Sequence, residues 1–241
     1  MSKLAIITGG TRGIGKATAI ALKNKGFTVV ANFFSNHDAA KEMSEKHSIQ
    51  AKQWNVADYD ECRQAVKEIE EEYKRPVSIL VNNAGITKDG MLHRMSQQDW
   101  HDVINVNLNS CFNMSSAVIA QMRNQNYGRI VNISSINAQA GQVGQTNYCA
   151  AKAALIGFTK ALAKESVSKN ITVNCIAPGY VRTEMMGQIP ERILEQIVAA
   201  IPMKRLGEPE EIARAVEFLT DENAGFITGE TLSINGGHNM V

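Results

Sequence analysis

The chain has 241 residues, of which 44% are hydrophobic, enough to build the continuous core of one α/β domain. Its 25 basic and 24 acidic residues give a formal net charge of +1. That balance excludes the strongly basic footprint typical of proteins that bind nucleic acid or an anionic membrane surface.

Short apolar runs alternate with segments of helical periodicity along the whole chain. The runs predict seven strands, at 4–8, 28–33, 51–56, 78–83, 128–134, 171–177 and 231–236. The segments between them predict helices at 14–25, 37–47, 59–73, 97–124, 147–168 and 208–219. This alternation predicts right-handed crossovers and a parallel sheet covered on both faces, in one domain spanning 1–241. The segment 182–207 is longer than a plain connection and predicts a substrate lid.

The four cysteines and five histidines show no metal-ligand spacing, so we expect no bound metal and no disulfide framework. The N-terminal MSKLAIITGG enters a strand at once, without the pattern of a leader peptide. Apolar runs long enough to span a membrane do not occur. We expect a soluble cytoplasmic protein with reduced thiols and no nucleic-acid or membrane partner.

A glycine-rich turn joins the first predicted strand to the first predicted helix. In TGGTRGIG (8–15), Gly9, Gly13 and Gly15 follow the pattern G-x-x-x-G-x-G. Glycines at such a turn let the backbone approach a pyrophosphate, whose charge is stabilised at the helix N-terminus. The alternative is a tight strand–helix turn that needs glycine only for its geometry.

The end of the second predicted strand bears on which dinucleotide is bound. An NAD site usually has a carboxylate there, which accepts from the ribose 2′-hydroxyl. This chain has Asn32, Phe33, Phe34 and Ser35 at that place. Arg12, in the glycine turn, is suited to a 2′-phosphate, so the sequence favours NADP(H). The alternative for Arg12 is a solvated loop cation.

Tyr148 and Lys152 are four residues apart at the start of a predicted helix, so their side chains share one face. One interpretation is a surface pair with the tyrosine partly packed. The other is a phenol whose proton is controlled by the neighbouring ammonium. The pair alone does not decide between them.

Seven motifs occur in a characteristic order: TGGTRGIG (8–15), NNAG (82–85), NVN (105–107), NISS (132–135), YCAAK (148–152), PGYVRT (178–183) and NGG (235–237). Over essentially its whole length the chain resembles the short-chain dehydrogenase/reductase family. The resemblance implies a doubly wound Rossmann-type sheet with strand order 3-2-1-4-5-6-7. It also implies a catalytic tetrad of Asn107, Ser135, Tyr148 and Lys152.

The same resemblance implies the cofactor contacts. They are Gly9, Thr11, Arg12, Gly13, Ile14, Gly15, Asn32, Ser35, Asn55, Val56, Asn83, Ala84, Gly85, Tyr148, Lys152, Pro178, Gly179, Val181 and Thr183. Asn55 stands where the family more often has aspartate, which weakens the expected contact with the adenine amine.

In the implied reaction Tyr148 exchanges a proton with the substrate oxygen while the nicotinamide exchanges hydride. Lys152 and the charge of the oxidised nicotinamide are expected to lower the pKa of the Tyr148 phenol from its reference value near 10. Ser135 is expected to position the oxygen, and Asn107 to hold a water that links Lys152 to solvent. Ser135 as a strand-end cap and Asn107 as a buried amide at a helix kink are the alternatives.

Within the family the chain resembles the β-ketoacyl thioester reductases, in which two branches act on acetoacetyl-CoA and on 3-oxoacyl-[acyl-carrier-protein]. INAQAGQVGQTNY (136–148) resembles the first branch, which implies an acyl pocket bordered by Gln142, Val143 and Gln145. Asp89 and Tyr180 are implied at the same pocket, together with Ser135 and Tyr148. The resemblance favours reduction of acetoacetyl-CoA to (R)-3-hydroxybutanoyl-CoA, with the carrier-protein substrate as the alternative.

The charges expected to dock an acidic carrier protein are incomplete. Members of the second branch often carry a cation before GRI and another before ITVN, and these places hold Asn126 and Lys169. Arg129 is close by in YGRI, so we expect weakened docking. Family members that keep the nucleotide site but act as sensors or scaffolds are a further alternative, which the presence of Tyr148 and Lys152 disfavours. The resemblance also implies a homotetramer.

Overall fold

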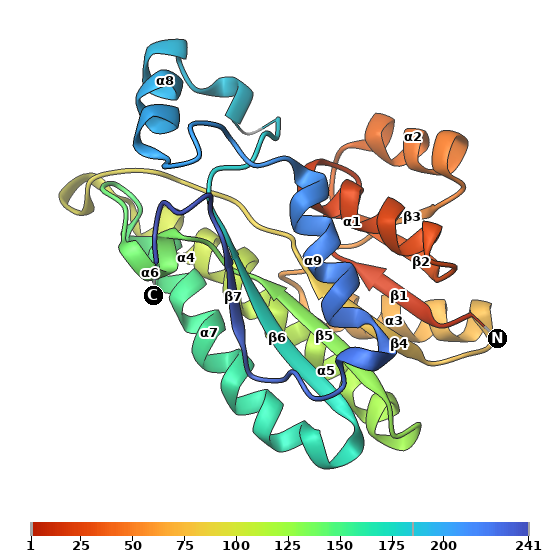
Figure 1. The fold of residues 1–241 in the computed structure, drawn as a ribbon. Coiled ribbons are helices and arrows are strands. Elements are labelled where there is room, and N and C mark those ends of the chain that lie inside the picture. The colour runs from red at the N-terminus through yellow and green to blue at the C-terminus, as the bar shows by residue number, and fades with distance from the viewer. Residues whose placement is uncertain (1, 185, 241) are drawn as a thin grey trace.

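The computed structural model describes residues 2–184 and 186–240; Met185, inside the predicted lid, lies outside the described residues. The strands form one parallel sheet in the order β3-β2-β1-β4-β5-β6-β7, as predicted (Figure 1). They are β1 (Leu4–Ile7), β2 (Thr28–Phe33), β3 (Gln50–Gln53), β4 (Val77–Asn82), β5 (Gly128–Ile133), β6 (Ile171–Pro178) and β7 (Thr231–Ile234).

Helices cover both faces of the sheet (Figure 1). One layer consists of α1 (Gly13–Asn24), α2 (His37–His47) and α9 (Pro209–Thr220), and the other of α3 (Tyr59–Tyr73), α5 (Ser110–Asn124) and α7 (Thr146–Ser166). Along β1, Leu4 and Ile6 pack in the core under α3 and α5, whereas Ala5 and Ile7 pack under α1 and α9. Because successive residues face opposite sides, a strand buried on both faces is apolar throughout.

The third strand is shorter than predicted. The sequence predicts a strand over 51–56, but β3 ends at Gln53. The chain turns at Asn55, whose carbonyl accepts from the Asp58 N–H at 3.1 Å and whose side chain accepts from the Ala57 N–H at 3.0 Å. The side-chain bonding of Asn55 to nearby backbone groups ends the strand.

The predicted helix 97–124 is interrupted. It divides into α4 (Gln97–Ile104), a π-helical turn at Asn105–Asn109, and α5. At the centre of that turn the amide of Asn107 donates to the carbonyl of Val103 at 2.9 Å, in competition with the backbone ladder. Such one-residue π insertions often mark functional positions in helices.

The topology gathers the loops that carry the sequence motifs at one edge of the sheet. β1 lies between β2 and β4, so the order of the chain reverses beside it. In doubly wound sheets the carboxyl ends of the strands at this reversal form the ligand crevice. The glycine turn follows β1, and NNAG, NISS and PGYVRT follow β4, β5 and β6 at the same edge.

The predicted lid contains a helix that the sequence analysis did not assign, α8 (Glu191–Ala200), which stands apart from the sheet in Figure 1. The two ends of the lid segment are joined by backbone hydrogen bonds. The Gly207 N–H donates to the Tyr180 carbonyl at 2.9 Å, and the Arg182 N–H donates to the Gly207 carbonyl at 2.8 Å. Within residues 2–184 and 186–240, no helix is both long and apolar enough to cross a bilayer. The same residues contain no group of His, Cys, Asp or Glu side chains arranged to hold a metal ion.

Candidate active site

Tyr148 and Lys152 lie one turn apart at the start of α7, on the face turned toward the strand ends. The Lys152 Nζ lies 5.7 Å from the centre of the Tyr148 ring. Only 3% of Lys152 is exposed, and its Nζ donates to the carbonyl oxygen of Ile133, the last residue of β5, at 2.8 Å. The structure therefore excludes a solvated surface pair and places a buried ammonium beside a phenol.

The expected direction of the Tyr148 pKa shift is wrong for the protein alone. Burial raises the pKa of Tyr148 to about 12, and a hydrogen bond from Ser135 opposes that rise only in part. Burial also lowers the pKa of Lys152. Both shifts have one physical cause, because a low-dielectric site disfavours the charged form of either group. The neutral phenol is thus the resting form near neutral pH.

Ser134 and Ser135 follow β5 and have different tasks. The Ser134 hydroxyl donates to the Lys152 carbonyl at 2.7 Å, which fastens α7 to the end of the strand. Ser135 is almost buried and accepts from the Asn137 N–H at 3.1 Å, and it lies near enough to Tyr148 to lower the pKa of the phenol in part. The structure thereby brings Ser135 to the phenol, as the resemblance implied.

Asn107 reaches the same cluster from the π-helical turn. Its Nδ2 donates to the carbonyls of Ile86 and Val103, both at 2.9 Å. Its buried Oδ1 has no hydrogen-bond partner among the described residues. Gly85 separates it from Lys152: a Cβ on Gly85 would lie 2.6 Å from the Asn107 Oδ1 and 3.5 Å from the Lys152 Nζ. A free acceptor beside a buried ammonium suits a bridging water.

The glycine turn has backbone geometry that other residues do not adopt easily. Gly9 and Gly13 have φ of 60° and 49°. A Cβ on Gly15 would overlap the Gly9 carbonyl oxygen. Within the described residues, α1 begins after Arg12 without a side-chain cap, so its first N–H groups are available to an anion.

The residues predicted to select the nucleotide occupy unequal positions. Arg12 and Ser35 are exposed at the edge of the crevice. Asn32 is 2% exposed, and its side chain accepts from the Gly9 N–H at 3.2 Å and donates to the Trp54 carbonyl at 2.9 Å. Asn32 thus supports the glycine turn from behind, while Arg12 and Ser35 face the solvent.

Thr8, the first residue of the TGGTRGIG motif, has a role that the sequence did not assign: it fixes the glycine turn to the neighbouring strand. Its hydroxyl accepts from the N–H groups of Asn83 and Ala84 at 2.9 and 3.0 Å. The Asn83 side chain in turn donates to the carbonyls of Thr8 and Gly9 at 2.9 and 3.2 Å. These bonds hold the ends of β1 and β4 together at the crevice.

The other predicted cofactor contacts lie along the same edge. Val56 is buried and Asn55 half-buried after β3. The methyl group of Thr183 lies 3.1 Å from where a Cβ of Gly13 would stand, so the first residues of the lid meet the glycine turn. The remaining predicted contacts at this edge are Thr11, Ile14, Pro178, Gly179 and Val181.

The predicted substrate residues, which we call the substrate rim, lie after β4, β5 and β6 and before and at the start of α7. Gln145 donates to the Asp89 carboxylate at 2.9 Å. The charge of Asp89 helps to raise the pKa values of Tyr148 and Tyr180. Gln142 and Val143 are exposed on the loop before α7, Val143 by 80%. The structure therefore joins Asp89 to Gln145 and leaves Gln142 and Val143 at the surface, while the Tyr180 ring lies against His238.

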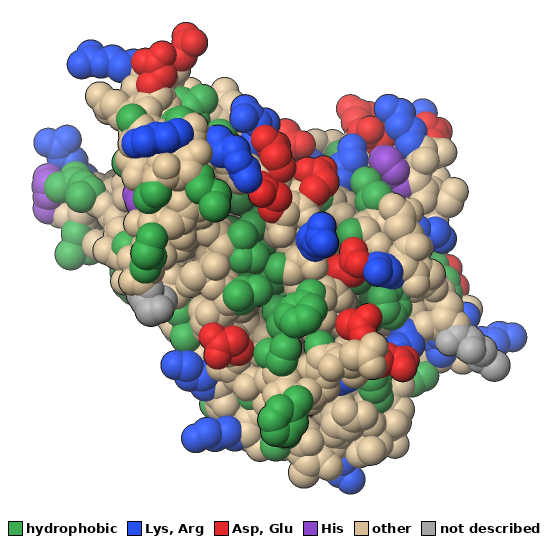
Figure 2. All heavy atoms as spheres, viewed as in Figure 1, with side chains coloured by type: hydrophobic (Ala, Val, Ile, Leu, Met, Phe, Trp, Pro, Cys, Tyr) green, Lys and Arg blue, Asp and Glu red, His purple; other side chains and the backbone are tan. Residues whose placement is uncertain are grey.

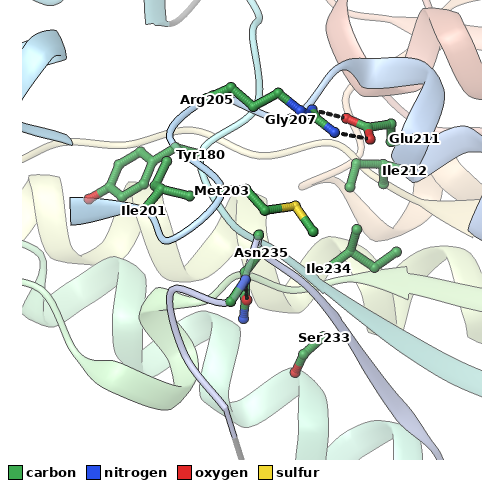
Figure 3. Close-up of a pocket in the computed structure, with 12 residues that line it drawn as sticks. Tyr180, Ile201, Met203, Arg205, Gly207, Glu211, Ile212, Ser233, Ile234 and Asn235 are labelled. Atoms are coloured by element: carbon green, nitrogen blue, oxygen red, sulfur yellow. Dashed lines mark hydrogen bonds and ion pairs between the residues drawn. The ribbon is translucent and has the colours of Figure 1, made fainter. Parts of the chain in front are cut away.

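A cavity of about 290 Å³ lies between the end of the lid and β7 (Figure 3). Its wall includes Tyr180, Met203 and Ile234, and the Arg205–Glu211 ion pair, with two contacts of 2.7 Å, closes one side. None of the tetrad lines it. The cavity is a gap beneath the base of the lid, adjoining the substrate rim only through Tyr180.

Arg129 is not available as a docking cation, contrary to its expected place near the surface. It is 1% exposed, and its guanidinium donates to four backbone carbonyls, those of Gly128, Asn170, Asp221 and Glu222. A cation used in this way ties β5 to the segment after α9. Of the two positions considered for docking, the one before GRI holds Asn126 and the one before ITVN holds Lys169, whose side chain is exposed.

These features fit a dinucleotide. The uncapped start of α1 suits a pyrophosphate, the backbone at Gly9 and Gly13 permits close approach, and the buried Lys152 retains donors beyond its bond to Ile133. The crevice lies where the strand order reverses, and the tetrad lies at the same edge of the sheet, where the far end of a bound dinucleotide is expected.

Comparison with known proteins gives consistent findings. A family model described as enoyl-(acyl carrier protein) reductase matches residues 9–239. The chain is 53% identical to acetoacetyl-CoA reductase of Shinella zoogloeoides and 54% identical to acetoacetyl-CoA reductase of Paracoccus denitrificans, in both cases over 100% of each chain. It is 42% identical to the 3-oxoacyl-[acyl-carrier-protein] reductase FabG of Staphylococcus epidermidis, also over 100% of each chain.

The strand order, the juxtaposed Tyr148 and Lys152 and the full-length identity all lead to one assignment. The chain belongs to the short-chain dehydrogenase/reductase family, whose members are oxidoreductases that use a nicotinamide cofactor.

Proposed function

We propose that the protein reduces a 3-oxoacyl thioester to the (3R)-3-hydroxyacyl thioester with NADPH, and that the substrate is acetoacetyl-CoA. The observation that carries the proposal is the buried Lys152 ammonium beside the Tyr148 phenol and the Ser135 hydroxyl. The substrate follows from the names of the relatives that are more than half identical over their whole length.

The chain's residues perform the proton-transfer half of this reaction. Bound NADPH supplies the hydride that reduces the carbonyl carbon. The Tyr148 O–H bond breaks as its proton passes to the carbonyl oxygen, and Ser135 holds that oxygen by a hydrogen bond. The Lys152 ammonium stabilises the phenolate left on Tyr148, and a water held by the Asn107 Oδ1 returns the proton from solvent through Lys152.

The pKa of Tyr148 favours the reductive direction at neutral pH. A phenol with a pKa of about 12 is protonated throughout the physiological range, so Tyr148 always carries the proton that reduction requires. Oxidation of the hydroxyacyl product requires phenolate. The positive charge of the oxidised nicotinamide is the influence that would lower the pKa for that direction.

The preference for NADPH over NADH is supported at the edge of the crevice. Arg12 is exposed beside the glycine turn, and β2 is followed by Phe34 and Ser35 instead of a carboxylate. A guanidinium pairs with a 2′-phosphate by charge-assisted hydrogen bonds, whereas a carboxylate at this place would repel it.

The alternative substrate is the 3-oxoacyl carrier-protein thioester, which the FabG relative's name supports. Burial of Arg129 argues against it, because an acidic carrier protein needs exposed cations to dock. Lys169 alone offers a weak surface charge. We therefore favour the CoA thioester.

We further propose a cytoplasmic homotetramer. Phe218 and Phe226 are exposed by 55% and 103%, and Figure 2 shows hydrophobic side chains gathered on the face that carries α9. Exposed apolar groups of this kind are typical of surfaces covered by another protein chain. All four cysteines are free, which is the usual state in a reducing compartment.

The test of the proposed function is NADPH oxidation with acetoacetyl-CoA and with acetoacetyl carrier protein at matched concentrations. We expect turnover of both, with a higher kcat/KM for acetoacetyl-CoA. A strong preference for the carrier-protein thioester would reverse the choice of substrate, and no turnover of either would refute the proposed reaction.

A further inference from the structure

We propose that Asp89, Gln145 and Asn137 form a relay of positioning residues that orients the Ser135 hydroxyl for catalysis. The relay crosses from the loop after β4, which carries Asp89, to the short helix α6 (Asn137–Ala140) after β5, by way of Gln145, the residue that precedes α7. It deepens the proposed function and rests on it, because orientation of Ser135 matters only if Ser135 acts on a substrate oxygen.

The relay has a single allowed polarity. The Gln145 Nε2 donates to the Asp89 Oδ2 at 2.9 Å. A carboxylate only accepts, so it forces the nitrogen end of the Gln145 amide toward itself. The Oε1 end is thereby turned to Asn137, whose Nδ2 donates to it at 2.9 Å. The charge of Asp89 thus fixes the orientation of two amides in series.

The last link of the relay reaches the catalytic hydroxyl. The backbone N–H of Asn137 donates to the Ser135 Oγ at 3.1 Å. Because this bond occupies an acceptor site of the hydroxyl, the Ser135 proton is directed elsewhere, on the side where Ser135 also lowers the pKa of Tyr148. With the side chain of Asn137 held by Gln145, its N–H keeps Ser135 a donor toward the place where the substrate oxygen would lie.

The loop that carries Asp89 is itself fixed, so the relay starts from a rigid point. The buried Asn147 donates to the Lys88 carbonyl at 3.0 Å, and the Gly90 N–H donates to the Gly144 carbonyl at 2.8 Å. Both bonds join the loop to the start of α7. Catalytic groups held by such supporting bonds keep the geometry that the reaction requires.

The relay changes the interpretation of Gln145. Each end of its amide already bonds another side chain, so the protein and not the thioester sets the orientation of the Gln145 amide. An acyl contact and a positioning residue give different kinetics: loss of a contact made equally in the ground and transition states raises KM, whereas loss of orientation lowers kcat.

The experiment uses the full-length protein with Gln145→Leu, Asp89→Leu, the double variant and Asp89→Asn. Gln64→Leu, on the exposed face of α3, is the matched control for the glutamine change. We expect kcat with acetoacetyl-CoA to fall about tenfold in each leucine variant while KM changes less than about twofold. The double variant should lose no more than the worse single variant, because one relay is broken in all three. Asp89→Asn retains an acceptor and should recover part of the loss.

A second readout needs no turnover. In a crystal structure of Gln145→Leu we expect Ser135 in another rotamer, or the Asn137 N to Ser135 Oγ distance beyond hydrogen-bonding range. A raised KM with wild-type kcat, additive losses in the double variant, or unchanged Ser135 geometry would each overturn the relay. If the wild-type protein reduces neither thioester, the proposed function fails, and the crystal structure still decides the relay.

Discussion

The Nζ of Lys152 donates to the carbonyl oxygen of Ile133 at 2.8 Å, so a helix and the end of a strand together hold a buried ammonium. An ammonium has three donors, and Ile133 accounts for the bond that the described residues provide. The site is consequently stable enough to keep its cation in place but leaves that cation under-solvated. Lys152 contributes to function at the expense of stability.

Replacement of Lys152 by methionine is therefore expected to abolish reduction and to stabilise the fold. Methionine is similar in length and carries no charge to desolvate, so we expect a gain of about 1–2 kcal/mol in the free energy of unfolding at neutral pH. Chemical denaturation of both proteins measures the difference, and a less stable methionine variant would contradict this account.

The gain should depend on pH in a defined sense. Burial lowers the pKa of Lys152 in the folded protein below 10.5, so the unfolded state binds the proton more tightly. The wild-type protein should gain stability as the pH rises through the folded pKa toward 10.5, and the advantage of the methionine variant should shrink over that interval. Denaturation curves at several pH values test this, and a difference that does not change with pH would exclude a buried ammonium.

Arg12→Ala tests the nucleotide preference. Loss of a charge-assisted bond to the 2′-phosphate should raise the KM for NADPH about tenfold and change that for NADH less than about twofold. Arg63→Ala, an exposed arginine on α3, is the control. Equal effects on both cofactors would show that Arg12 does not recognise the phosphate.

Gly15→Ala tests the geometry of the glycine turn. The new Cβ would overlap the Gly9 carbonyl oxygen and lie 2.5 Å from the Asn83 Nδ2. We expect a loss of about 1–3 kcal/mol in stability and weaker NADPH binding. Gly225→Ala is the matched control, because its Cβ meets its nearest atoms at 3.5 Å and its φ is −63°. Two variants with equal stability and equal NADPH affinity would contradict the close packing of the turn.

Lys169→Ala tests whether the exposed cation that precedes ITVN docks a carrier protein. A single surface charge contributes little, so kcat/KM with acetoacetyl carrier protein should fall less than about threefold. Lys164→Ala, also exposed near the end of α7, is the control. A loss of tenfold or more that is confined to Lys169→Ala and to the carrier-protein substrate would favour the alternative substrate.

The centre of the sheet could be predicted from the sequence because β1, β2, β4, β5 and β6 are buried on both faces and appear as mainly apolar runs, whereas the edge strands β3 and β7 are only partly buried. The strand order came from the motifs and is confirmed. The sequence allowed a helix kink at Asn107 only as an alternative and did not show its π-helical form, because the side-chain bond from Asn107 to Val103 leaves the apolar periodicity intact. Helix α8 has a helical apolar pattern at Ile193, Leu194, Ile197 and Val198, but the segment was interpreted only as a lid, and none of its residues is buried against the core.

The site was predicted less completely than the sheet. The motifs identified all four tetrad residues that the structure brings together, but the direction of the Tyr148 pKa depends on burial, which a sequence motif does not contain. The same applies to Arg129, whose charge suggests a surface residue while its four carbonyl partners keep it inside. The link from Asp89 to Asn137 joins three separate loops and becomes visible only when they are folded together.

The pH dependence of the two directions follows from the phenol. Because the pKa of Tyr148 is raised to about 12, kcat/KM for reduction should be nearly constant from about pH 6 to pH 9. The rate of the reverse oxidation, which needs phenolate, should rise with pH over the same interval. If kcat/KM for reduction fell as the pH was raised from 6 to 9, with the enzyme still folded, the pKa of the proton donor would be lower than the structure indicates.

Tyr148→Phe tests the central claim most directly, since it removes one oxygen atom and leaves the ring in place. NADPH affinity, measured by fluorescence titration, should stay within about twofold of wild type, while kcat for acetoacetyl-CoA should fall by about a thousandfold or more. Reduction at the wild-type rate by this variant would contradict the assignment of Tyr148 as the proton donor.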